Sequence, residues 1–245
     1  MIMNNKLLTM LMAALFPAFC AANGNPPAPK AVTKGYNSID ARSWGLSGKV
    51  KSVTSTLFEA WPGESGLVRG NEKSDHPVLM CTFDENGRVT LDQMDNIYVY
   101  DKKGNFVKGN SEFAKMTRDA NGRVATYDCQ EDEEDYTQWH STFGYDAQGR
   151  LITLSTSYWE ALSEDTLYYE GDKLWPVRMV REEQAEADFY KYEITYRYTK
   201  SDSQGNWTER EIHTKTFSRC EADDDDPGTI EYTYEIEVRA LEYWE

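Results

Sequence analysis

The fold is decided by a short stretch, YDAQGRL at residues 145–151, because close copies of it recur along the chain. The shared pattern is an aromatic residue, Asp, two variable residues, Gly, Arg or Asn, and then an apolar residue. Three further good copies, a shortened one and a lengthened one lie at residues 83–89, 100–106, 118–124, 169–174 and 198–207. In the copy at 118–124, Arg118 replaces the aromatic residue. This repetition predicts one supersecondary unit used several times.

Each copy has the residues of a β-hairpin tip. An Asp early in a turn accepts hydrogen bonds from backbone N–H groups a few residues later, which closes the loop. A Gly late in the turn adopts the positive φ that other residues resist, as in a type I turn with a G1 bulge. The turn residues assigned in this way are Asp84, Gly87, Asp101, Gly104, Asp119, Gly122, Asp146, Gly149 and Gly205.

The segments between the turns alternate in polarity. In residues 190–198 and 230–238 every even position is apolar or aromatic, and this period of two predicts antiparallel strands with one buried face. Residues 159–165 and 181–188 are rich in Glu and Ala and predict either a turn or two of helix or hairpin loops. We therefore expect an all-β fold over residues 41–245, an antiparallel hairpin-repeat meander that forms one long twisted sheet with little helix.

The first 22 residues have the pattern of a secretory signal peptide. Lys6 is followed by an apolar run over residues 7–19 and then by small residues up to Ala22, where cleavage is expected. The run is shorter than the ~20 residues that span a bilayer, so no transmembrane segment is expected. An alternative makes Cys20 the lipidated first residue of a lipoprotein, but Phe19 stands where lipoprotein signals have a small residue. Either reading predicts an exported protein, periplasmic, at the cell surface or secreted.

Residues 23–40 are expected to be a flexible spacer, because three Pro residues occur there without apolar periodicity. Once the signal peptide is removed, Cys81, Cys129 and Cys220 remain, an odd number. One disulfide with a leftover thiol and three buried thiols are both compatible with this count. No Cys or His spacing is typical of a zinc site.

Composition excludes one class of partner. The chain has 26 Lys and Arg against 42 Asp and Glu, a net charge of −16, which argues against nucleic acid because phosphate binding needs clustered cations. Aromatic residues make up 13% of the chain, which argues against disorder. The run Asp223, Asp224, Asp225 and Asp226 is a weak calcium candidate without the alternating spacing of a calcium loop. We expect no catalytic residues and no cofactor, since no phosphate loop or hydrolase motif is present.

The repeated turns resemble the YD repeats of Rhs-type proteins, and most closely the short secreted forms of Bacteroidetes. The resemblance rests on the turns and on the line Tyr196-Arg197-Tyr198 followed by GNWTER at residues 205–210. It implies hairpins stacked side by side into one sheet. The large family members wrap such sheets into a shell around a toxin, but this chain is too short for a shell and carries no toxin domain. The family pattern contains no catalytic residues to transfer.

Three functions remain open. The first is a binding or scaffold module that meets a protein partner at the cell envelope through a sheet face or edge. The second is a carbohydrate-binding module, for which the possible ligand platform is Trp139, Trp159 and Trp207. The third is an unrecognised hydrolase, which predicts a concave pocket with convergent carboxylates. An envelope protein or glycan of unknown identity is thus the expected partner.

Overall fold

The structure is a computed structural model that describes residues 39–73, 78–130, 137–158, 161–220, 223 and 225–245. The described residues form one short helix, α2 (Ile39–Ser43), and fifteen strands. The strands are β1 (Val50–Pro62), β2 (Leu67–Glu72), β3 (Val78–Phe83), β4 (Val89–Leu91), β5 (Val99–Tyr100), β6 (Phe106–Lys108), β7 (Lys115–Arg118), β8 (Val124–Gln130), β9 (Thr137–Tyr145), β10 (Leu151–Tyr158), β11 (Ala161–Tyr168), β12 (Arg178–Ala185), β13 (Asp188–Ser201), β14 (Trp207–Cys220) and β15 (Thr229–Tyr243).

Thirteen of the strands form one antiparallel sheet, in the order β4-β3-β1-β15-β14-β13-β12-β11-β10-β9-β8-β7, with β2 paired to β1. Strands β7 to β15 are a simple meander in which every strand pairs with its successor, so the all-β hairpin meander that the repeats predict is confirmed. The last strand, β15, then pairs with the first, β1. Strands β5 and β6 form a small separate hairpin.

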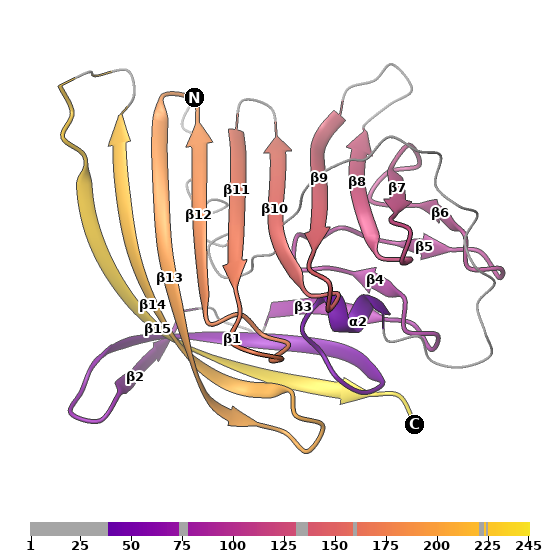
Figure 1. Cartoon of the computed structure of the whole chain (residues 1–245), viewed down its shortest axis with the longest axis horizontal. Helices are drawn as coiled ribbons and strands as arrows, with labels where there is room; N and C mark the ends of the chain where they lie inside the picture. Colours follow the sequence, from indigo (N-terminus) through magenta and orange to yellow (C-terminus); the bar gives the residue numbers. More distant parts are fainter. Residues whose placement is uncertain (1–38, 74–77, 131–136, 159–160, 221–222, 224) are drawn as a thin grey trace.

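The long sheet curves so that its two ends share one core (Figure 1). Side chains of β1 and β3, such as Val53 and Phe83, belong to the same buried cluster as Tyr127, Phe143 and Leu154 of β8, β9 and β10. Figure 1 shows β1 and β3 crossing the lower ends of the meander strands, with α2 and β4 beside them. A second cluster under β11 to β14 contains Leu167, Met179, Tyr192, Ile194 and Ile212.

The inward face carries buried charge as well as apolar side chains. Arg181 of β12 donates to both carboxylate oxygens of Asp165 on β11, each at 2.6 Å, and the Asp165 side chain is fully buried. A carboxylate in a protein interior needs such a partner because its hydration is lost. The pair sits directly across two strands in register, as the Asp165–Arg181 pairing shows.

Two segments differ from the sequence expectations. Residues 161–165 and 181–185 belong to strands β11 and β12, not to helices or loops, and of the second segment only residues 186–187 form a turn, between β12 and β13. Their charged residues fit a sheet because the two inward ones, Asp165 and Arg181, pair with each other and the others are partly or fully exposed. The end of the expected spacer, Ile39 and Asp40, is helical, and Asp40 is buried by contacts with β4 and β7.

The expected signal peptide with Cys20, and the rest of the spacer, lie outside the described residues. Within the described part of the chain, no helix has the length and apolar character needed to cross a membrane.

Candidate functional site

The predicted turns share one hydrogen-bonding scheme. In the turn after β9, Oδ1 of Asp146 accepts the backbone N–H groups of Gln148 and Arg150, both at 2.9 Å, and Oδ2 accepts Nε of Arg150 at 2.7 Å. Gly149 supplies the positive φ, +82°. In the turns at Asp84, Asp101 and Asp119, the Asp carboxylate likewise accepts a hydrogen bond from the side chain of the Arg or Asn four residues later.

The structure contains one turn of this kind that the sequence pattern did not reveal. In residues 92–96, Oδ1 of Asp92 accepts the N–H groups of Met94 and Asn96, and Oδ2 accepts the Asn96 amide at 3.0 Å. Asp95 takes the Gly position with φ +59°. Asp adopts this backbone region more readily than most residues, so a search for Gly alone misses the turn.

The lengthened copy at residues 198–207 contains a turn of the same kind, which begins at Asp202. Asp202 accepts the N–H groups of Gln204 and Asn206, and Gly205 has φ +83°. Irregular pairing between β13 and β14 near Lys200 shifts the turn relative to the aromatic residue. The Asn206 side chain bonds to Ser47 and Tyr243 instead of closing its own turn.

Successive turns are linked through the Arg of one and the aromatic residue of the next. The Arg123 guanidinium carbon lies 4.3 Å from the ring centroid of Tyr145, and the Tyr145 hydroxyl donates to the Val124 carbonyl at 2.7 Å. Cation–π contact and hydrogen bond together explain why the pattern needs both Arg and Tyr. The equivalent stacks are Arg88 on Tyr100 at 4.7 Å and Arg150 on Tyr169 at 4.5 Å. These positions therefore hold the repeats together.

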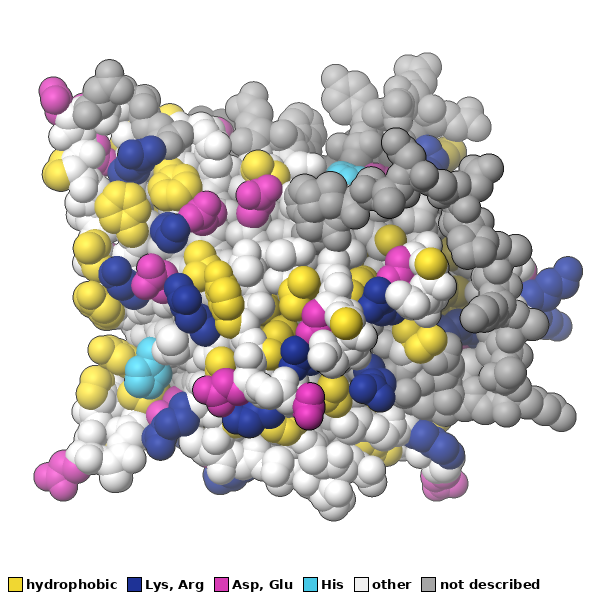
Figure 2. Space-filling view, in the orientation of Figure 1, with side chains coloured by type: hydrophobic (Ala, Val, Ile, Leu, Met, Phe, Trp, Pro, Cys, Tyr) yellow, Lys and Arg dark blue, Asp and Glu magenta, His cyan; other side chains and the backbone are white. Residues whose placement is uncertain are grey.

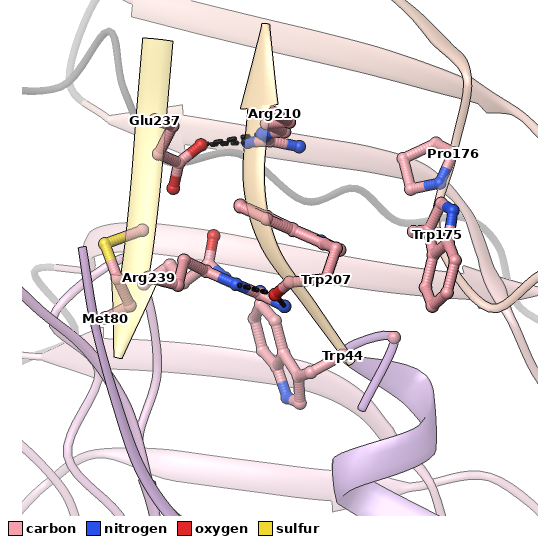
Figure 3. Close-up of a pocket in the computed structure, with 10 residues that line it drawn as sticks. Trp44, Met80, Trp175, Pro176, Trp207, Arg210, Glu237 and Arg239 are labelled. Atoms are coloured by element: carbon pink, nitrogen blue, oxygen red, sulfur yellow. Dashed lines mark hydrogen bonds and ion pairs between the residues drawn. The ribbon is translucent and has the colours of Figure 1, made fainter. Parts of the chain in front are cut away.

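A small cavity lies where the loop after α2 meets β3, β14 and β15 (Figure 3). Its lining includes three tryptophans, two arginines and a methionine: Trp44, Trp175, Trp207, Arg210, Arg239 and Met80. The volume open to the centres of water molecules is about 20 Å³. Since one water needs roughly 10–15 Å³ by this measure, the cavity has room for a water or a small ion but not for a sugar ring.

The two arginines of the cavity are held differently. Arg210 pairs with Glu237, with Nε and Nη2 at 2.7 and 2.6 Å from Oε2, while Arg239 bonds the carbonyl oxygen of Trp207 at 3.2 and 3.4 Å. Figure 3 draws both contacts, with the Arg239 guanidinium next to the Trp207 ring. Burial and the neighbouring charge of Arg210 together lower the pKa of Arg239 to about 10, against the attraction of Glu237. Arg239 is still a cation at neutral pH.

The outward face of the long strands carries a second feature, which we name the β15 patch: Phe189, Phe217, Ile230, Tyr232 and Tyr234. Ile230 is paired with Phe217 across β14 and β15, and the Phe217 and Phe189 ring centroids are 6.5 Å apart. Ile230 and Tyr232 are 55% and 63% exposed. Figure 2 shows hydrophobic and basic side chains gathered on the left, where β13, β14 and β15 run.

The patch borders an unpaired sheet edge. Strand β14 pairs with β15 over Thr229–Val238, whereas β1 pairs with it only over Glu235–Tyr243. On the side of β15 away from β14, residues 229–234 therefore have no described strand as a partner. Alternate residues of this edge direct their N–H and C=O groups away from β14. We name this segment the β15 edge.

The expected tryptophan platform is not brought together as an exposed surface. Trp207 is only 4% exposed and its ring lies between Arg210 and Arg239, with guanidinium carbons 4.5 and 3.5 Å from the centroid. Trp139 is partly buried and donates its indole N–H to Asn96 at 2.8 Å. Trp159 lies outside the described residues.

The calcium candidates act as loop formers where the structure describes them. Asp226 accepts the N–H groups of Cys220 and Gly228 at 2.6 and 2.8 Å, and Asp223 accepts that of Asp225 at 3.1 Å. Asp224 lies outside the described part. Among the described residues, no three His, Cys, Asp or Glu side chains are grouped to hold a metal ion.

The described cysteines match neither alternative in full, because Cys220 is partly exposed. Cys81 and Cys129 are 1% and 2% exposed in the shared core, and no disulfide joins described cysteines. Burial raises the pKa of the Cys81 thiol to about 12.

Comparison with known proteins assigns the chain to no family. No protein-family model matches the chain, and no curated protein matches its sequence.

Proposed function

We propose that this protein is an exported, non-catalytic binding module that accepts an extended segment of a partner protein at the β15 edge. The observation that carries the proposal is the combination of an unpaired strand edge with the exposed side chains of Ile230 and Tyr232 on the same six residues. Hydrogen bonds to the edge would give affinity, and the β15 patch would select the partner's side chains.

Physical reasoning favours a protein partner at this position. Proteins usually protect long sheet edges with charge, proline or covering loops, because an open edge invites pairing with another chain. Here the edge keeps Ile230 and Tyr232 exposed, and apolar and aromatic side chains are typical of the centre of protein interfaces. The turn ladder of the meander gives the edge a fixed support, which reduces the ordering entropy that binding must overcome.

The turn geometry also supports a relationship to YD-repeat proteins, which we include in the proposal. In that relationship the Tyr-Asp-x-x-Gly-Arg units build the scaffold, and the specific surface lies elsewhere. The export expected from the N-terminal sequence would place the binding surface in the cell envelope or outside the cell.

The test is capture from an envelope extract of the source cells, with the mature protein as bait. Ile230→Glu places a charge in the patch, and we expect it to abolish capture. Val107→Glu on β6 is the matched control, since Val107 is 52% exposed and lies away from β15, and it should capture the same partner as the unaltered protein. Equal capture by all three forms would contradict the proposal.

Two further measurements separate the alternatives. Light scattering after size exclusion tests whether a second copy of this chain is the partner, which predicts a dimer that Ile230→Glu dissociates. A glycan array tests the carbohydrate alternative, and binding that Tyr232→Ala removes would replace the protein partner by a sugar.

A further inference from the structure

We propose that the cavity beside Arg239 binds a small monovalent anion such as chloride or nitrate. This site is separate from the β15 edge and from the proposed partner.

The charges that line the cavity do not balance. Glu237 is committed on both carboxylate oxygens: Oε2 accepts Arg210 at 2.7 Å and Oε1 accepts the Ser55 hydroxyl at 2.7 Å. Among the described residues no carboxylate lies within ion-pair distance of Arg239. Two arginines and one glutamate therefore leave the lining with one positive charge in excess. The buried carboxylate of Asp92, which precedes the lining residue Gln93, accepts hydrogen bonds from Asn96 and Tyr98 instead.

Arg239 is buried, which makes that excess unfavourable. Arg239 is only 7% exposed. Its Nε and Nη2 donate to the Trp207 carbonyl oxygen at 3.4 and 3.2 Å, and these distances are longer than those of strong charge-assisted hydrogen bonds. The Trp207 ring face, 3.5 Å from the guanidinium carbon, supplies some compensation. A buried charge normally requires a counter-ion, and an anion in the adjoining cavity would provide it.

The cavity has the size and the lining for this ligand. About 20 Å³ open to water centres suits one chloride-sized ion and excludes sulfate or an organic acid. Gln93 adds a side-chain amide to the lining. The −16 charge of the whole chain would keep anions from collecting on the surface, so binding would depend on this built site.

The experiment measures thermal unfolding and tryptophan fluorescence while sodium chloride replaces sodium gluconate at constant ionic strength. We expect a saturable rise of the unfolding midpoint and a saturable fluorescence change, reproduced by bromide and nitrate but not by sulfate. Arg239→Met should raise the half-saturating chloride concentration at least about tenfold, because one charge-assisted bond is lost. Arg178→Met, on the exposed outward face, is the matched control and should respond as the unaltered protein does.

Absence of a saturable response in the unaltered protein, or an equal response in Arg239→Met, would overturn the proposal. If Arg239→Met does not fold, crystals of the unaltered protein grown in bromide decide the question. An anomalous peak beside Arg239 supports the site, and bromide crystals without such a peak refute it.

Discussion

The carboxylate of Asp40 accepts two hydrogen bonds from the guanidinium of Arg118, at 2.6 and 2.9 Å. Asp40 is in α2 and Arg118 in β7, one terminal strand of the sheet, while Asp40 also accepts the N–H of Val89 in β4, the other terminal strand. A single buried carboxylate thus joins both ends of the sheet, and Arg118 has the place that an aromatic residue has in other copies of the turn.

This bridge predicts a large effect on stability. Asp40→Ala should lower the free energy of unfolding by about 2 to 3 kcal/mol, because it leaves a guanidinium and a backbone N–H without their acceptor. Urea unfolding measures the change. Lys51→Met, which breaks the exposed ion pair with Glu242, is the control and should change stability by less than about 1 kcal/mol. Equal effects of both substitutions would contradict the bridging role.

The positive-φ positions of two turns, Gly149 and Asp95, predict opposite effects of substitution on stability. Gly149→Ala should destabilise by about 1 to 2 kcal/mol, because an added Cβ would lie at an ordinary contact distance of 3.7 Å from Nη1 of Arg123 and the loss therefore comes from the φ of +82°. Asp95→Gly, at φ +59° in the turn without glycine, should be neutral or stabilising. Thermal unfolding of both variants tests this, and a loss in Asp95→Gly equal to that in Gly149→Ala would argue against a common turn.

The turn at Asp101 predicts a pH dependence. The Asn105 amide and backbone N–H groups hold the pKa of Asp101 below its usual range. A carboxyl whose pKa is lower in the folded state contributes stability above the unfolded pKa of about 3.9, and that contribution disappears as the pH falls through the folded value. NMR titration of the Asp101 carboxyl should show the low pKa, and Asn105→Ala should raise it. An unchanged pKa in Asn105→Ala would show that the amide bond is unimportant.

The core predicts which thiols react. Cys81 is buried with a pKa of about 12, whereas Cys220 is partly exposed on β14. Because the thiolate is the reactive form, a soluble thiol reagent at neutral pH should label Cys220 rapidly and Cys81 only on unfolding. Mass spectrometry of labelled peptides gives the two rates. Rapid native labelling of Cys81 would mean that the shared core opens.

The strands and turns were predictable because their causes are local. Alternating polarity fixes a strand such as residues 190–198, and an Asp and a Gly three residues apart fix a hairpin tip such as Asp146 to Gly149. The turn at Asp92 escaped prediction because Asp95 performs the role of glycine, a substitution that sequence pattern alone does not distinguish.

The sites were not predictable because they depend on distant pairings. The β15 edge exists because β1 leaves β15 at Glu235, and the buried excess charge exists because Glu237 is taken by Arg210 and Ser55. Neither follows from residue spacing. Trp207 looked like a ligand platform in the sequence, but the sheet places it between two arginines.

The proposed binding role of the β15 edge is tested most directly by amide hydrogen exchange of the peptide spanning Thr229–Tyr234, with and without the captured partner. We predict that the partner slows exchange in this peptide at least about tenfold, since new strand pairing protects amides that now face solvent. The peptides of β9 and β10, already paired on both sides, should change little. Unchanged exchange over Thr229–Tyr234 in a saturated complex, with protection appearing on another surface, would contradict the account.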